Sequence, residues 1–166
     1  MKHLFILCLC TLLLTACSQK TPDSITGGTA KATTVPTSIP TIEAPQTKLT
    51  VFYPDENLES FLQAEVLFAS LDENTILHEL IHAVPLDHEI TVKSFSVIGT
   101  ELRLDLSREF EEMILSLGTS GERMVIGSIV NTYLTAYGAN TMVLTVEGEP
   151  LNSGHIVYDF PMEFFQ

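Results

Sequence analysis

The chain has 166 residues, of which 21 are acidic and 8 are basic, so its formal net charge at pH 7 is −13. A protein this acidic is repelled by nucleic acid and by anionic lipid headgroups, which excludes nucleic acid as a partner and basic residues as a means of membrane attachment. The three cysteines, Cys8, Cys10 and Cys17, all lie near the amino terminus. The rest of the chain therefore offers no thiol for a disulfide, a zinc site or a nucleophile.

The first residues predict an export signal. Lys2 precedes an apolar run over residues 4–14, which is too short to remain as a membrane-spanning helix. The run ends in Leu-Thr-Ala-Cys, which resembles the bacterial lipobox. We expect a signal peptide over residues 1–16 and a diacylglyceryl lipid on Cys17, which would hold the protein on the outer face of the cytoplasmic membrane. The alternative is a plain secretory signal in which Cys17 is incidental.

A stretch rich in Thr, Pro, Ser and Ala follows Cys17 and extends to Thr47. It has no aromatic residue and few aliphatic ones, so it cannot bury enough apolar surface to offset its ordering entropy. Residues 17–47 are therefore predicted to form a lipidated, disordered tether. The remaining residues, 48–166, have the usual length of a single folded domain.

The first half of this domain predicts a strand and a helix with an ambiguous segment between them. Residues 48–53 alternate in polarity and run into Pro54-Asp55, which predicts a strand followed by a turn. Residues 59–70 suit a strand, but their composition also tolerates a helix. From Asp72 to Val84 the apolar residues have helical spacing, with Asp72 placed to cap the helix.

A hairpin follows. Residues 91–98 and 101–106 predict two strands, because the intervening Gly99-Thr100 suits a type II′ turn. In the second strand three leucines alternate with charged residues, which indicates one buried and one solvated face.

The last third predicts a helix and further strands. Thr119 and Glu122 have the spacing of a capping box at a helix start, and Gly138 is placed to end that helix. Residues 141–147 predict a strand, and residues 156–158 a shorter one. The apolar stripe of the helix comprises Val125, Ile126, Ile129, Val130, Tyr133, Leu134 and Tyr137. Together the elements predict an α/β (α+β) two-layer sandwich, with a small mixed sheet and two helices packed on one face.

The sharpest chemical motif is HELIHAVPLDH at residues 78–88. Its histidines have the spacing of the long zinc signature HExxHxxGxxH, so the motif resembles metzincin proteases. In such a site His78, His82 and His88 would bind Zn²⁺, and Glu79 would act as general base on the metal-bound water. A zinc metallopeptidase is therefore the alternative function.

Three features favour an ordinary amphipathic helix at this motif. Pro85 stands where the signature has its bend glycine, and the fixed φ of proline, about −65°, does not provide that bend. His78 and His82 fall opposite the apolar stripe, on the predicted solvent side. The folded sequence before the motif is too short to build the upper half of a zinc-protease cleft. We therefore expect no catalytic, cofactor-binding or metal-binding residue.

Two other groups of residues invite a functional interpretation. Asp105, Glu109, Glu111 and Glu112 form an acidic cluster, which we expect to be a solvated face because no EF-hand spacing is present. The aromatic end, residues 158–165 (YDFPMEFF), is expected to close the core, with an exposed part as a candidate partner surface.

Four segments in order give the domain a resemblance to the GerMN domain of sporulation and spore-germination lipoproteins of Gram-positive bacteria. They are VFYPDE at 51–56, LRLDLSREF at 102–110, GSIVNTYLTAYGANTMVLTVEGEPL at 127–151 and GHIVYDFPM at 154–162. The DLS-x-EF step and the VNT helix that leads into a V-x-G turn are the most specific parts.

The resemblance implies a non-enzymatic interaction module outside the cytoplasmic membrane, similar to the ring-building domains of sporulation channel assemblies. It brings no catalytic or ligand residues with it, and it implies one or more protein partners in the cell envelope. The solvated side of the predicted hairpin, around Glu101, Arg103 and Asp105, is a candidate contact surface.

Overall fold

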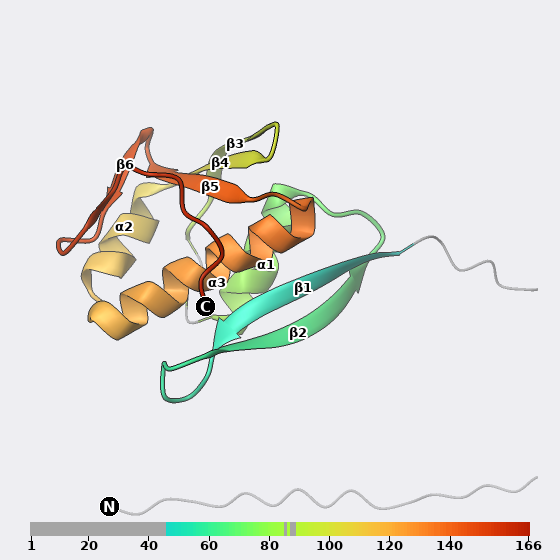
Figure 1. The fold of residues 1–166 in the computed structure, drawn as a ribbon, viewed down its shortest axis with the longest axis horizontal. Coiled ribbons are helices and arrows are strands. Elements are labelled where there is room, and N and C mark those ends of the chain that lie inside the picture. Colours follow the sequence, from blue (N-terminus) through green and yellow to red (C-terminus); the bar gives the residue numbers. More distant parts are fainter. Residues whose placement is uncertain (1–45, 85, 87–88) are drawn as a thin grey trace, which may run out of the picture. The chain divides into compact units, whose positions relative to one another are not determined.

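The computed structural model describes residues 46–84, 86 and 89–166. The predicted signal peptide, Cys17 and nearly all of the predicted tether lie outside these residues. The elements, shown in Figure 1, are β1 (Thr47–Pro54), β2 (Phe61–Phe68), α1 (Glu73–Ala83), β3 (Val92–Ile98), β4 (Glu101–Leu106), α2 (Arg108–Leu115), α3 (Thr119–Tyr137), β5 (Thr141–Val146), β6 (Glu149–Asn152) and β7 (Val157–Tyr158).

The strands form two sheets. The larger has the order β3-β4-β5-β6-β7, in which β4 and β5 are parallel and the other neighbours are antiparallel. The predicted alternation in β4 is confirmed, because Leu102, Leu104 and Leu106 are buried and the residues between them are not. β1 and β2 form a separate antiparallel ribbon with an unbroken register from Thr47–Phe68 to Pro54–Phe61.

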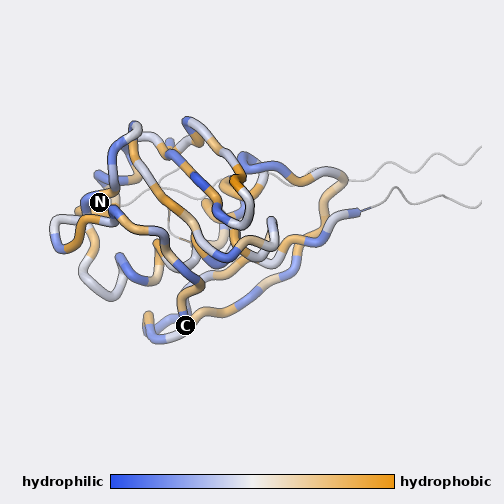
Figure 2. Tube along the Cα trace, turned by 45° about the horizontal axis from the view of Figure 1, so that its top comes forward, coloured by the Kyte–Doolittle hydropathy of each residue, from blue (hydrophilic) through white to orange (hydrophobic). Residues whose placement is uncertain are grey.

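The helices lie on one face of the larger sheet, and the β1–β2 ribbon covers α1 and α3 from the opposite side (Figure 1). α3 is buried without interruption from Met124 to Leu134, which is typical of a helix that is enclosed rather than half exposed. Along both strands of the ribbon, hydrophobic residues are interspersed with polar ones (Figure 2). The predicted mixed α/β class is confirmed, and none of the described helices is long and apolar enough to cross a membrane.

Three local features go beyond the prediction. The ambiguous segment is a strand, β2, since it pairs with β1 along its whole length. α2 was not predicted as a helix, although Phe110 and Ile114 bury its inner side. The ribbon is separate from the mixed sheet instead of extending it.

The two predicted helix starts have different outcomes. Asp72 caps α1 as predicted, because its carboxylate accepts hydrogen bonds from the Thr75 amide and hydroxyl, both at 2.8 Å. The predicted capping box of α3 is wrong. Gly118 is the N-cap residue, Thr119 is already helical, and no side chain caps the first turn. Gly138 ends α3 as predicted, with a left-handed φ of 61°.

α3 also supplies a hydrogen-bond acceptor to the ribbon. The Phe52 amide in β1 donates to Thr132 Oγ1 in α3 at 2.9 Å, and Thr132 is fully buried. A buried amide without an acceptor is costly, so this bond helps to hold the ribbon edge on the helix.

We expect Thr132→Val to lower the free energy of unfolding by about 1–3 kcal/mol, because valine keeps the shape of threonine but leaves the Phe52 amide without its acceptor. Urea unfolding of the purified chain measures this. Thr135→Val, on the exposed side of the same helix, is the matched control. Equal stability of the two variants would contradict the assignment.

Candidate interaction surface

The predicted zinc motif lies on the outside of α1. His78 and His82 are exposed one turn apart, with ring centroids 4.6 Å apart, while Ile76, Leu77 and Leu80 are buried. The Glu79 carboxylate is 3.6 Å from His78 Nδ1. The predicted solvent side is thus confirmed.

Pro85 and His88 lie outside the described residues, so the full ligand set of the predicted zinc site is not placed. Within residues 46–84, 86 and 89–166 no three His, Cys, Asp or Glu side chains converge on a point that could hold a metal ion. The zinc metallopeptidase stays an alternative prediction.

The solvated side of the β3–β4 hairpin is largely occupied by contacts within the domain. Arg103 Nε donates to Glu101 Oε1 at 2.9 Å. Asp105 Oδ1 accepts from Thr145 Oγ1 at 2.6 Å and from the Gly148 amide at 2.8 Å, which joins β4 to the β5–β6 turn. Asp105 is therefore a structural residue, and Arg103 is the most available side chain of the three.

Three residues of the predicted acidic cluster, Glu109, Glu111 and Glu112, lie in α2, and Asp105 lies in β4. Glu111 lies 3.7 Å from Arg108 and also accepts from the Asn152 amide at 3.3 Å. A hydrogen bond from the Ser107 hydroxyl lowers the pKa of Glu109. Glu112 is exposed. The carboxylates point to different partners, which agrees with a solvated face.

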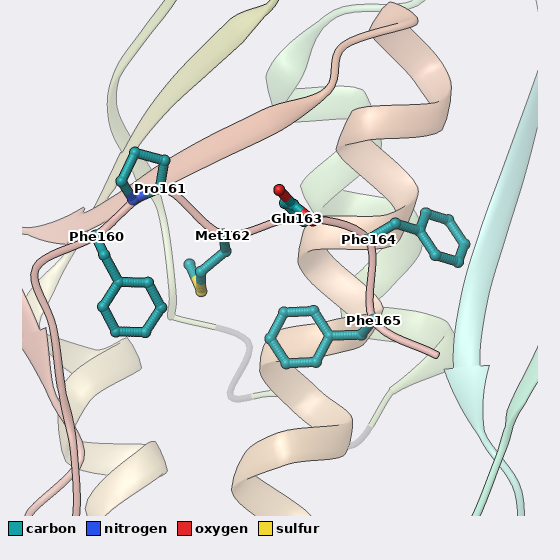
Figure 3. A pocket seen from close by; sticks show the side chains of 6 residues that line it. All are labelled: Phe160, Pro161, Met162, Glu163, Phe164 and Phe165. Carbon is teal, nitrogen blue, oxygen red and sulfur yellow. The ribbon is translucent and has the colours of Figure 1, made fainter.

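The C-terminal aromatic segment, residues 160–165, closes part of the core as predicted and leaves two aromatic rings exposed. It lines a depression of about 270 Å³, shown in Figure 3. Met162 is buried and Phe165 packs against the core, whereas Phe160 and Phe164 remain 47% and 48% exposed. Phe164 also packs edge-on against Phe52 of β1, with ring centroids 5.2 Å apart. One side of the segment thus closes the core, and the other presents aromatic rings to solvent.

Backbone hydrogen bonds fix this segment. Met162 pairs with Met142 of β5 through two bonds of 2.8 Å. The buried Asn131 side chain of α3 donates to the Phe165 carbonyl at 2.9 Å and accepts from the Phe165 amide at 2.8 Å. The exposed rings are therefore carried on an ordered backbone, which lowers the entropy cost of binding through them.

Glu122, predicted to be a capping residue, is instead a buried carboxylate that is 2% exposed. It accepts from Tyr158 Oη at 2.7 Å and lies 3.2 Å from His155 Nδ1. Burial alone would raise its pKa, but hydrogen bonds from Tyr158, Ser153 and His155 outweigh burial and lower it. The same burial and hydrogen bond raise the pKa of Tyr158. This network ties the start of α3 to β7.

A family model named Germane, described as sporulation and spore germination, matches residues 46–152. The chain belongs to this family. No functionally curated protein matches it. The match confirms the resemblance predicted from the sequence and ends at Asn152, so the C-terminal aromatic segment lies beyond it.

Solved structures share the fold. The tandem GerMN domains of the sporulation protein GerM from Bacillus subtilis align with a TM-score of 0.55 and 17% identity, covering 72% of this chain and 46% of theirs. The chain thus spans less than half of that tandem protein. At this identity the comparison establishes the fold alone.

Two further structures align with TM-scores below 0.5. A predicted lipoprotein from Clostridium perfringens has a TM-score of 0.47 and 18% identity, covering 71% of this chain and 87% of that one. The first GerMN domain of GerM from Bacillus subtilis has a TM-score of 0.48 and 14% identity, covering 61% and 84% respectively.

The buried hydrogen bonds of Asn131 and Glu122 in this Germane domain were not predicted from the sequence. The available signal was weak: both are polar residues inside an otherwise apolar helix, and such residues are buried only when they have hydrogen-bond partners. Their partners, Phe165 and Tyr158, lie more than thirty residues away in the sequence.

Because its folded-state pKa is lowered, Glu122 contributes stability above its ordinary pKa of 4.5, and this contribution is lost as the pH falls through the lower folded value. We expect Glu122→Gln to remove that part of the acid sensitivity. Urea unfolding between pH 7 and pH 3 measures the difference between the variant and the parent. Glu112→Gln, which removes the same charge from the exposed side of α2, is the control. Identical pH profiles for Glu122→Gln and the parent would contradict the prediction.

Proposed function

We propose that this chain is a lipid-anchored, extracytoplasmic interaction module that takes part in assembling a protein complex of the bacterial envelope during sporulation or spore germination. The observation that carries the proposal is the Germane match over residues 46–152. The shared fold with GerM, which is a sporulation protein, agrees with it.

Attachment to the membrane comes from the proposed lipid on Cys17. The charge of −13 gives the domain no electrostatic attraction to anionic headgroups. Two acyl chains provide enough buried methylene groups for stable anchoring, which a single chain does not. Residues 17–47 then hold the domain at the outer face of the cytoplasmic membrane, where it meets its partners.

Metabolic labelling with a clickable palmitate analogue tests the anchor. The parent chain is expected to be labelled and to sediment with membranes, because Cys17 is the only thiol left after cleavage. Cys17→Ser is expected to lose the label and to appear in the soluble fraction. An unlabelled parent chain that is nevertheless exported would support the plain secretory signal instead.

The proposed contact surface is the exposed side of the C-terminal aromatic segment, at Phe160 and Phe164. Exposed aromatic rings on an ordered backbone are typical of binding hot spots.

We expect Phe160→Ser/Phe164→Ser to lose the partner that co-purifies from membranes of sporulating cells. Val97→Ser/Ile98→Ser is the matched control, because these β3 side chains have similar exposures of 49% and 56%. Partner retention in the aromatic variant, with both variants folded by circular dichroism, would contradict the proposed surface.

The proposed module has no catalytic activity. The alternative, a zinc metallopeptidase, makes a distinct demand: bound zinc in stoichiometric amount, together with peptide cleavage that Glu79→Gln abolishes. Zinc analysis and a peptide-library assay on the purified full chain would together overturn the non-enzymatic proposal if both were positive.

A further inference from the structure

β2 has one edge that no described element covers. Its other edge is paired with β1, and it ends the two-stranded sheet. It lies at the rim of the domain in Figure 1. An uncovered strand edge presents unpaired amide and carbonyl groups, which is a template for pairing with a further strand.

The alternation of hydrogen-bonded and non-hydrogen-bonded pairs between β1 and β2 shows which backbone groups of β2 face that open edge. In an antiparallel pair, opposite residues either bond to each other or both point away. Phe52, opposite Gln63, sends its amide to Thr132 of α3, whereas Asp55 bonds to Ser60 at 2.9 Å. The residues of β2 with outward backbone groups are therefore Phe61, Gln63, Glu65 and Leu67.

The usual protections of a strand edge are missing in β2. It contains neither proline nor lysine, and its register has no bulge. Its one charged residue, Glu65, forms a 2.7 Å ion pair with Lys48 of β1. By contrast, the outer strand β3 of the larger sheet has a register shift beside Lys93, and β7 has two residues. Among the described sheet edges, β2 is thus the one best suited to pairing.

Two exposed leucines add to this edge. Leu62 and Leu67 are 45% and 58% exposed. A partner strand that covers them has to supply apolar neighbours and must not place a carboxylate opposite Glu65.

We propose that β2 pairs antiparallel with β2 of a second copy of this chain, about a two-fold axis at Ala64. In this register Phe61 lies opposite Leu67, Leu62 opposite Val66, and Gln63 opposite Glu65. Every outward backbone group of residues 61, 63, 65 and 67 finds a partner.

The neighbouring register, with its axis at Glu65, is disfavoured. It places two Glu65 carboxylates opposite each other, which is destabilising. It also sets Phe61 opposite residue 69, beyond the end of β2. Self-complementarity in side chains and backbone groups thus favours the Ala64 register over the Glu65 register and makes a copy of the same strand a suitable occupant.

The pairing rests on the proposed function in one respect, because a lipid anchor concentrates both copies at one membrane surface. The net charge of −13 on each chain opposes association, so salt is expected to strengthen the pairing by screening this repulsion. The C-terminal aromatic segment is not part of the contact and stays available to another partner.

Cysteine cross-linking of the full chain in membranes tests the proposal against a background that has no thiol in the folded part. Ala64 would form a non-hydrogen-bonded pair with itself across the axis, at a spacing that permits a disulfide. With copper phenanthroline as oxidant, Ala64→Cys is expected to give a covalent dimer. Glu65→Cys, although more exposed, is expected not to, and Ser96→Cys on the exposed side of β3 reports random collisions.

A second substitution tests whether the Ala64→Cys cross-link depends on strand pairing. Leu67→Lys, combined with Ala64→Cys, is expected to lose the covalent dimer, because a lysine on the edge blocks pairing. Leu67 is mostly exposed, so the domain remains folded, and Val97→Lys on β3 with Ala64→Cys is the matched control.

Three results would overturn the inference. They are no dimer of Ala64→Cys above the Ser96→Cys level, equal dimer from Glu65→Cys, or a dimer that persists in Leu67→Lys. None of these affects the partner tested through Phe160 and Phe164, so failure of self-pairing is distinguishable from failure of the proposed function.

Discussion

The enclosure of α3 between two sheets is the constraint on which the other features depend. Its inward stripe packs on the five-stranded sheet, and its other sides receive the β1–β2 ribbon and the C-terminal aromatic segment. A helix enclosed in this way has no solvent to satisfy polar groups that approach it. Its buried polar residues therefore make specific bonds. Thr132 accepts from β1, Asn131 binds the backbone of Phe165, and Glu122 accepts from Tyr158.

Two of these contacts support the surfaces proposed for binding. Asn131 holds the segment that presents Phe160 and Phe164, so these rings project from an ordered backbone. Thr132 accepts a hydrogen bond from Phe52 on the inner edge of β1. In the same ladder, Gln63 opposite Phe52 has its backbone N–H and C=O on the open edge of β2, where a further strand can pair with them. One helix thus supports both of the surfaces proposed for binding, the C-terminal aromatic segment and the β2 edge.

The negative charge of the chain disfavours electrostatic contacts both with anionic membranes and with other copies of the chain. With 21 acidic and 8 basic residues, the chain is repelled by anionic membranes and by its own copies. Contacts that overcome this repulsion have to be short-range, through apolar side chains and backbone hydrogen bonds. Those are the features found at the C-terminal aromatic segment and at the β2 edge, whereas the charged sides of β4 and α2 are occupied by pairs within the domain.

The sequence by itself determined the elements whose signals are local. The hairpin at Gly99-Thr100, the Asp72 cap, the end of α3 at Gly138 and the solvent side of His78 all follow from neighbouring residues, and the ordered motifs indicated the family. Only the tertiary structure decided that 61–68 is a strand, that the ribbon stands apart from the mixed sheet, and that Glu122 is buried rather than capping. The physical reason is distance along the chain. A strand needs a partner to be one, and the partners of Glu122, Asn131 and Thr132 are brought to α3 from both ends of the domain by folding.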